Sequence, residues 1–197
     1  MSLYPQDCLS PLRRKKVTDA GPTPSPLAYG VHRTRTLNLI QPTVLIYSLG
    51  TSNRTPGEFL DLFTEHEIEV GVDIRSFPTS RFPHFTKQAL QNLLESNGIH
   101  YEYLGKELGG FRKGGYLAYM KTDSFRIGLE RLEEMGRRRR AAFFCSERFP
   151  WRCHRRWVAR KLNERGWKIV HIIEKGRVWI PLLKSPPAVG RGSIERV

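Results

Sequence analysis

From residue 43 onward, short apolar runs alternate along this chain with stretches whose apolar residues recur at helical spacing. Residues 44–49 are apolar and partly β-branched and are closed by Gly50, a pattern typical of a buried strand. Alternation of such strands with helices predicts βαβ units and a sheet covered on both faces. We therefore expect an α/β protein: a single three-layer domain with a mainly parallel sheet of five strands, or of six, flanked by helices.

The expected elements can be placed by residue number. Strands are predicted at residues 44–49, 68–74, 99–104, 141–144 and 168–173, with a further edge strand at residues 177–182. Helices are predicted at residues 56–66, 85–97, 116–120, 124–135 and 157–165. Thr55 is placed to cap the first helix with Pro56 at its first position, and Gly98 is placed to end the second.

Both ends of the chain differ in composition from the middle. Residues 1–42 contain six prolines and scattered charges without a hydrophobic period. Such a segment buries too little apolar surface to offset the entropy of ordering, so we expect a flexible or extended basic arm. Residues 185–197 are rich in proline, glycine and serine and are expected to form a loose tail. The α/β domain is therefore predicted to span residues 43–184.

The chain carries a formal net charge of +14. An excess of this size favours a polyanionic partner such as nucleic acid or a nucleotide, although a basic surface that only aids solubility is the alternative. The positive charge is unevenly placed, and three clusters contribute heavily to it, at residues 13–16, 137–140 and 152–160. We expect a phosphate-bearing partner, and no membrane partner because no apolar run is long enough to span a bilayer.

Cysteine usage bears on the compartment. Three cysteines do not make a disulfide framework, and one of them, Cys8, lies in the predicted arm. Cys145 and Cys153 share a segment dense in polar side chains, which fits a reducing environment better than an exported protein. The N-terminus lacks the apolar stretch of a signal peptide. We therefore expect a cytoplasmic protein.

Polar side chains follow three of the predicted strands, at residues 50–54, 73–83 and 145–147. In open α/β sheets, ligands bind beyond the carboxyl ends of the strands, at the point where the strand order reverses. If the sheet is doubly wound, these three segments converge at one edge and form a ligand-binding cleft. The first segment would bring ligand-binding donors to it, namely Thr51, Ser52, Asn53 and Arg54.

Two charged residues close the second predicted strand. Asp73 and Arg75 are two positions apart and hence on the same face of that strand. Because a buried carboxylate needs a partner, Asp73 is either part of a scaffold ion pair or a catalytic group. Arg75 and Arg81 are candidates for binding a phosphate or carboxylate through two parallel hydrogen bonds.

The turn between the fourth predicted strand and the last predicted helix is the most reactive segment of the sequence. Cys145 is a candidate low-pKa nucleophile if arginines and a helix N-terminus stabilise its thiolate, and a small buried strand-end residue otherwise. His154 is a candidate general base, or a hydrogen-bond donor to a bound phosphate. Glu147 is a candidate proton relay, or the partner of an arginine in a salt bridge. Cys153 and Arg155 complete the candidate ligand-binding groups.

Two further interpretations stay open. A glycine-rich loop begins at Gly105, and its segment at residues 107–116 is either a lid whose Arg112 grips an anion or a plain connection. Cys145, Cys153 and His154 include residue types that bind zinc or iron–sulfur clusters, but their spacing matches no familiar zinc pattern. We therefore favour anion binding and expect no cofactor.

Four motifs in this order resemble the domain of unknown function 488 family: residues 46–54, 72–78, 108–110, and 145–147 together with 153–155. The resemblance covers roughly residues 43–175. It implies a compact α/β domain with a polar cleft of enzyme-like appearance, without a settled activity. The positions that match the family's characteristic residues are Asp73, Arg75, Cys145, Glu147, Cys153, His154 and Arg155.

These observations lead to one main prediction and two alternatives. The main prediction is an enzyme-like domain, a hydrolase or transferase if catalytic, that binds a nucleotide or nucleic acid in a basic cleft at the strand ends. The first alternative is a non-catalytic nucleic-acid-binding module in which the basic arm and the arginine run at residues 137–140 dominate affinity. The second is a metal-binding protein that uses Cys145, Cys153 and His154.

Overall fold

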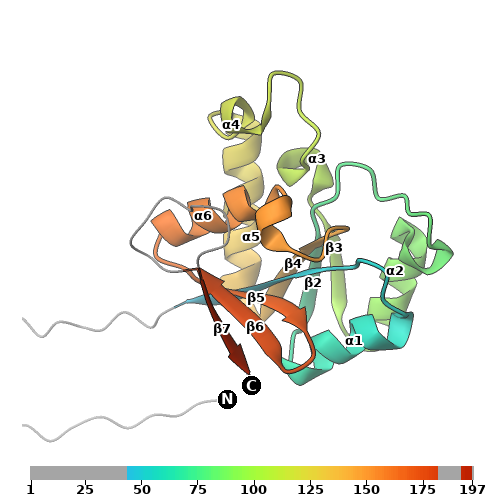
Figure 1. Cartoon of the computed structure of the whole chain (residues 1–197). Coiled ribbons are helices and arrows are strands. Elements are labelled where there is room, and N and C mark those ends of the chain that lie inside the picture. The colour runs from blue at the N-terminus through green and yellow to red at the C-terminus, as the bar shows by residue number, and fades with distance from the viewer. Residues whose placement is uncertain (1–43, 182–191, 197) are drawn as a thin grey trace, which may run out of the picture. The chain divides into compact units, whose positions relative to one another are not determined.

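The computed structural model describes residues 44–181 and 192–196. Its elements, in chain order, are β1 (Leu45–Gly50), α1 (Pro56–Glu65), β2 (Val70–Asp73), η1 (Pro83–Phe85), α2 (Lys87–Glu95), β3 (His100–Tyr103), α3 (Gly105–Leu108), α4 (Tyr116–Tyr119), α5 (Asp123–Arg138), β4 (Ala141–Cys145), η2 (Pro150–Arg152), α6 (Arg155–Glu164), β5 (Lys168–Glu174), β6 (Arg177–Pro181) and β7 (Gly192–Arg196). Figure 1 shows these elements along the chain.

The strands of the described residues form one sheet in the order β3-β2-β4-β1-β5-β6-β7. The first five in this order pair in parallel, whereas β6 and β7 run antiparallel to their neighbours. The predicted α/β class with a mainly parallel sheet is therefore confirmed. Strand β4 lies between β2 and β1, so three strands that are distant in sequence end at the same edge.

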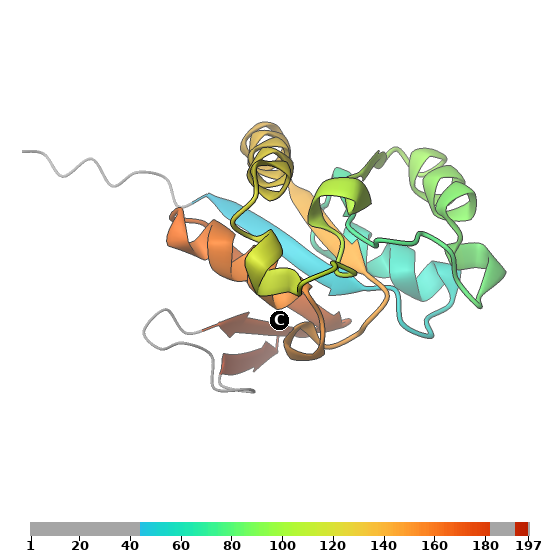
Figure 2. The same cartoon turned by 90° about the horizontal axis from the view of Figure 1, so that it is seen from above.

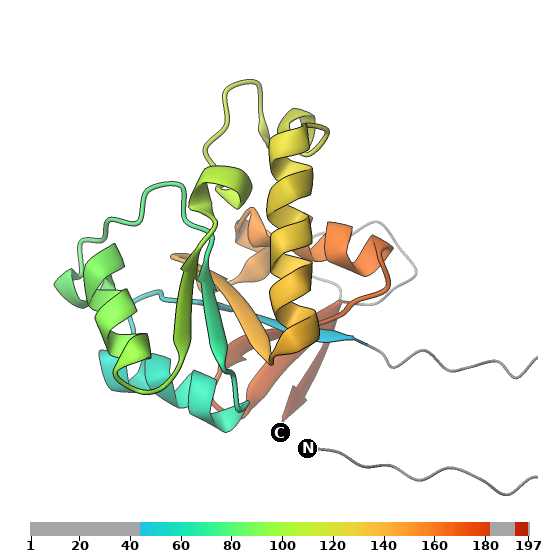
Figure 3. The same cartoon turned by 180° about the vertical axis from the view of Figure 1, so that it is seen from behind.

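Helices cover both faces of the parallel part of the sheet. On one face, Phe59 and Phe63 of α1 and Leu90 of α2 pack against Phe144 of β4 and its neighbours. On the other face, α5 and α6 contribute a second core cluster around Phe143. Figure 3 shows α5 lying over this second face, and Figure 2 shows the same layers from above. The predicted three-layer arrangement follows from strands that are apolar on both sides.

Local signals set the ends of several helices as the sequence predicts. Thr55 caps α1 through its hydroxyl, which accepts from the Glu58 amide, while the Glu58 carboxylate accepts from the Thr55 amide. Gly98 adopts a φ of 75° just after α2, a conformation that favours glycine and stops the helix. The last turn of α5 carries Arg137 and Arg138, which complement the negative end of the helix dipole.

The structure corrects two expectations. Residues 192–196 belong to the predicted loose tail, but they form β7, which pairs with β6, so β6 is not an edge strand. The glycine-rich loop contains the short helix α3, which was not predicted. The predicted arm at residues 1–42 lies outside the described residues. Across residues 44–181 and 192–196, no helix is long and apolar enough to cross a membrane.

Candidate functional site

The segments that follow β1, β2 and β4 meet at one edge of the sheet. Gly50 at the end of β1 is in register with Cys145 at the end of β4, and Asp73 at the end of β2 is in register with Phe144. The Thr51 amide also donates to the Cys145 carbonyl at 2.8 Å. This convergence is the geometry expected from the strand-end rule for open sheets.

A pocket of about 340 Å³ opens beside the ends of β2 and β4. The loop after β2, the glycine-rich loop and the turn after β4 all contribute to its wall. The lining residues are Arg75, Ser76, Phe77, Gly110, Phe111, Cys145, Ser146, Glu147, Arg152, Cys153 and His154. Five of the residues singled out from the sequence therefore share this pocket: Arg75, Cys145, Glu147, Cys153 and His154.

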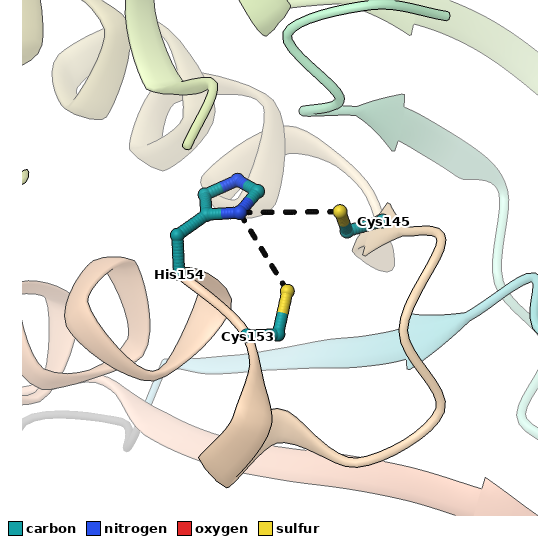
Figure 4. A group of neighbouring side chains, drawn as sticks. All are labelled: Cys145, Cys153 and His154. Atoms are coloured by element: carbon teal, nitrogen blue, oxygen red, sulfur yellow. Dashed lines mark hydrogen bonds between the residues drawn. The ribbon is translucent and has the colours of Figure 1, made fainter. Parts of the chain in front are cut away.

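Two free thiols and one imidazole meet in the pocket (Figure 4). His154 Nδ1 lies 3.9 Å from Cys145 Sγ and 3.6 Å from Cys153 Sγ, and the three possible ligand atoms all lie within 4.8 Å of one another. His154 Nε2 lies 3.1 Å from the Ile74 carbonyl oxygen. Because a carbonyl can only accept, Nε2 carries the hydrogen, and Nδ1 faces the sulfur atoms as an acceptor.

The two thiols differ strongly in acidity. Hydrogen bonding from Cys145, together with His154 and the charge of Arg155, outweighs burial and lowers the pKa of Cys153 to about 3. The same interaction with Cys153, together with burial, raises the pKa of Cys145 well above its ordinary value. The interaction between the two thiols therefore favours the thiolate at Cys153 over the thiolate at Cys145, the position that the sequence suggested.

Arg155 directly follows the pocket residue His154, does not itself line the pocket, and is fully buried. Its guanidinium donates to Ser48 Oγ at 2.9 Å, to the Arg148 carbonyl at 3.0 Å and to the Glu147 carbonyl, while its Nε has no partner. Within the described residues, no carboxylate lies within ion-pairing distance of Arg155. A buried cation favours a negative charge nearby, and the charge of Arg155 is one of the causes that lower the pKa of Cys153.

Asp73 and Arg75 form a buried ion pair rather than an open anion site. Asp73 accepts from the Arg75 amide, Nε and a terminal nitrogen, and also from the Tyr101 hydroxyl at 2.9 Å. The other terminal nitrogen of Arg75 donates to the Phe85 carbonyl at 2.6 Å. Each nitrogen of this guanidinium thus already donates a hydrogen bond within the protein. Asp73 packs with Tyr101 on the face covered by α1 and α2, whereas Cys145 packs on the opposite face.

The predicted ligand loop at residues 51–54 does not line the pocket. Thr51 and Arg54 are buried, and Arg54 donates to the Gly50 and Ile173 carbonyls, which ties β1 to β5. Burial, together with repulsion from Arg148 and Arg155, lowers the pKa of Arg54 to about 10. The Ser52 amide donates to the Ser146 carbonyl, and the side-chain Oδ1 of Asn53 accepts from Arg148. This loop is therefore hydrogen-bonded to the turn after β4, which lines the pocket, without lining the pocket itself.

Three other candidates lie in different places. Arg81 is exposed and stacks on the Phe82 ring, away from the pocket lining. Arg112 stacks on Tyr119 at 3.9 Å and donates to carbonyls of α3, so it holds the glycine-rich loop instead of facing the pocket. Glu147 does line the pocket, where one carboxylate oxygen accepts from the Phe149 amide at 3.3 Å.

The glycine-rich loop approaches His154 closely. A Cβ atom at Gly110 would lie 2.6 Å from His154 Nδ1, so only glycine fits here without displacement. The Tyr116 ring lies 5.4 Å from the imidazole, and its hydroxyl donates to the Leu108 carbonyl at 2.7 Å. The loop therefore forms a fixed wall of the site.

Sequence reasoning missed part of the lining and part of its support. Phe77 and Phe111 belong to segments that the sequence singled out, but nothing in the pattern indicates that their rings stay exposed. Ser48 and His171 lie on buried strands, where His171 Nδ1 is 3.1 Å from Ser48 Oγ. Burial and repulsion from Arg155 lower the pKa of His171 well below its ordinary value.

The arginine run at residues 137–140 lies at the other end of the sheet, where β1 and β4 begin. Arg137, Arg138 and Arg140 each pair with a glutamate, so much of their charge is already balanced. A hollow of about 340 Å³ there is lined by Leu45, Glu69 and residues 136–140. This basic surface and the cysteine pocket are thus separate features.

The family model described as "Domain of unknown function DUF488" matches residues 55–162, more than half of the chain, and the protein therefore belongs to this family. The match includes β2, β4 and the turn into α6 but not the motif at residues 46–54. Neither the curated proteins nor the solved structures contain a match to this chain.

Proposed function

We propose that the pocket is the active site of a cysteine-dependent hydrolase or transferase that binds a phosphate-bearing ligand. The observation that carries this proposal is the meeting of Cys145, Cys153 and His154 at the wall of an open pocket, with one thiol strongly acidic. A nucleophile, a base within reach and a group that orients the base are the parts that covalent catalysis requires. Here they are Cys153, His154 and the Ile74 carbonyl.

The residues suggest a definite sequence of steps. His154 Nδ1 takes the proton of the Cys153 thiol, and Arg155 stabilises the thiolate that remains. Cys153 Sγ then bonds to the electrophilic atom of the ligand, and the leaving group departs with its electron pair and takes the proton from His154. Water or an acceptor hydroxyl, deprotonated by His154, breaks the S–ligand bond and restores the thiolate.

Anion binding is supported by the charges at and next to the pocket. Arg152 is exposed on the pocket wall, and Arg155, which directly follows the pocket residue His154, is buried. The net charge of +14 favours approach of a phosphate-bearing ligand from solution. Two free thiols of this kind remain reactive only under reducing conditions, which favours a cytoplasmic location.

Alkylation of Cys153 tests both parts of the proposal. Iodoacetamide labelling, followed by mass spectrometry, should proceed at Cys153 at a nearly constant rate between about pH 5 and pH 8, because the thiolate already dominates there. Inorganic phosphate or pyrophosphate should slow the labelling. The Arg152→Gln variant should weaken this protection, whereas Arg160→Gln, which removes an exposed arginine paired with Glu164, should not.

The possible results separate the competing interpretations. A labelling rate that climbs steeply toward pH 8 would refute the thiolate, and labelling that phosphate leaves unchanged would refute the phosphate-bearing ligand. Stoichiometric zinc in the purified protein would favour a metal centre. A histidine that ligates a metal through one ring nitrogen usually donates a hydrogen bond from the N–H of the other to an oxygen, as His154 does to the Ile74 carbonyl. Nucleic-acid binding that depends on residues 137–140 and not on Arg152 would favour the non-catalytic module.

A further inference from the structure

Two phenylalanine rings stand exposed at the rim of the cysteine pocket. Phe77 is 65% exposed and Phe111 is 77% exposed, and both line the pocket that holds Cys145 and His154. Their ring centroids lie 5.5 Å apart with an angle of 54° between the planes. We call these two side chains the phenylalanine pair. They are the two most exposed large hydrophobic side chains among the described residues.

The backbone that carries the phenylalanine pair is held by hydrogen bonds and close packing. The Phe111 amide donates to Ser76 Oγ at 2.9 Å, and the Ser76 carbonyl accepts from the Tyr103 hydroxyl at 3.2 Å. Gly109 packs so tightly on Ser76 that no side chain fits between them. The loop after β2 and the glycine-rich loop are therefore joined directly behind the two rings.

Exposed apolar rings on a hydrogen-bonded backbone favour the binding of a flat apolar group. Each ring leaves most of its apolar area in water, and the two rings adjoin each other at the rim of one pocket, where contiguous exposed apolar surface can mark a ligand-binding groove. A flat ring can stack on a phenylalanine face and remove this area from water, and the fixed backbone reduces the entropy lost on binding. Because the same pocket carries Arg152, an aromatic group and a phosphate of one ligand can be bound together.

We propose that the phenylalanine pair stacks on the base of a nucleotide whose phosphate lies toward Arg152 and Cys153. This inference rests on the proposed function and names its substrate class. The occupant is a mononucleotide and not a nucleic-acid strand, because a pocket of about 340 Å³ has the size of a small-molecule site. Stacking does not select among bases, so the phenylalanine pair recognises the ring rather than a particular base.

Calorimetric titration with matched ligands tests the inference. Adenosine monophosphate carries both groups, ribose 5-phosphate lacks the base, and a single-stranded oligonucleotide represents the strand. Phe77→Ala and Phe111→Ala should each weaken adenosine monophosphate binding about 5-fold to 150-fold, the range expected for loss of one stacked base. Ribose 5-phosphate binding should stay unchanged in both variants, and Phe111→Tyr, which keeps the ring, should bind as the unaltered protein does.

Leu117→Ala is the matched control, because Leu117 is 57% exposed and does not line the pocket. It should leave both affinities unchanged. If adenosine monophosphate binds no more tightly than ribose 5-phosphate, or if the two alanine variants have no effect, the stacking inference is overturned and the proposed phosphate site stands. If no phosphate compound binds to the unaltered protein, the proposed function fails and this inference with it. Tighter binding of the oligonucleotide that depends on Phe77 would overturn the mononucleotide in favour of a strand.

Discussion

Replacing Asp73 by asparagine should strongly destabilise this protein. The substitution keeps the size of the side chain and removes its charge, which leaves the guanidinium of Arg75 buried without a counter-charge. One carboxylate oxygen of Asp73 accepts from Arg75 at 2.6 Å and from Tyr101 at 2.9 Å, and an amide nitrogen at that position would face two donors instead. Loss of one partner of a buried pair costs about 3–5 kcal/mol, a large part of a typical stability of about 5–15 kcal/mol.

Equilibrium unfolding in urea measures this effect. Asp61→Asn is the matched control, since Asp61 forms an exposed pair with Lys175 and its loss should cost at most about 1 kcal/mol. Tyr101→Phe should fall between the two because it removes one hydrogen bond and leaves the ion pair. If Asp73→Asn costs no more than Asp61→Asn, the assignment of Asp73 to the scaffold is wrong.

The same variants separate a structural role from a catalytic one. Asp73 lies on the face opposite to Cys145, so its loss should change stability without changing the pH profile of Cys153 alkylation in the folded protein. Tyr101→Phe provides the test if Asp73→Asn does not fold. If the pH profile of Cys153 alkylation changed while stability did not, Asp73 would instead have the catalytic role that the sequence suggested.

Three further predictions concern the support of the pocket. Arg155→Met should raise the pKa of Cys153, because the buried cation that stabilises its thiolate is lost. A pH titration followed by the ultraviolet absorbance of the thiolate measures this pKa, and a titration curve like that of the unaltered protein would contradict the prediction. Gly50→Ala should destabilise the protein by about 1–3 kcal/mol in thermal or urea unfolding, because the added Cβ would meet the backbone of Glu147. Gly57→Ala in α1 is the control: the space around Gly57 is free, so this substitution should be neutral or stabilising. The folded-state pKa of His171 lies below its ordinary value of about 6.5, so the unfolded state binds more protons at acidic pH, and stability should fall as the pH drops below about 6.5. His171→Asn should flatten this fall, and an unchanged slope would argue against the neutral buried imidazole.

Local patterns in the sequence were sufficient for most of the fold. Apolar runs next to helical periodicity predicted the parallel strands, and Thr55 and Gly98 marked helix ends, because these signals depend on residues that are neighbours in the chain. The same patterns failed for residues 192–196, whose strand depends on pairing with β6 and not on composition. The rule that ligand sites lie at strand ends also led to Cys145, Cys153 and His154 before their distances were known.

The sequence by itself determined the α/β class, the edge of the sheet that carries the pocket, and the cysteine and histidine residues found there. Only the tertiary structure decided that Asp73 and Arg75 form a buried ion pair, that contact between the two thiols lowers the pKa of Cys153 and raises that of Cys145, and that Phe77 and Phe111 stand side by side. The physical reason is that charge pairing, desolvation and exposure depend on atoms brought together from distant parts of the chain. The sequence shows which charged, thiol and aromatic groups are present, whereas folding determines which of them are paired with other groups of the protein and which stay exposed.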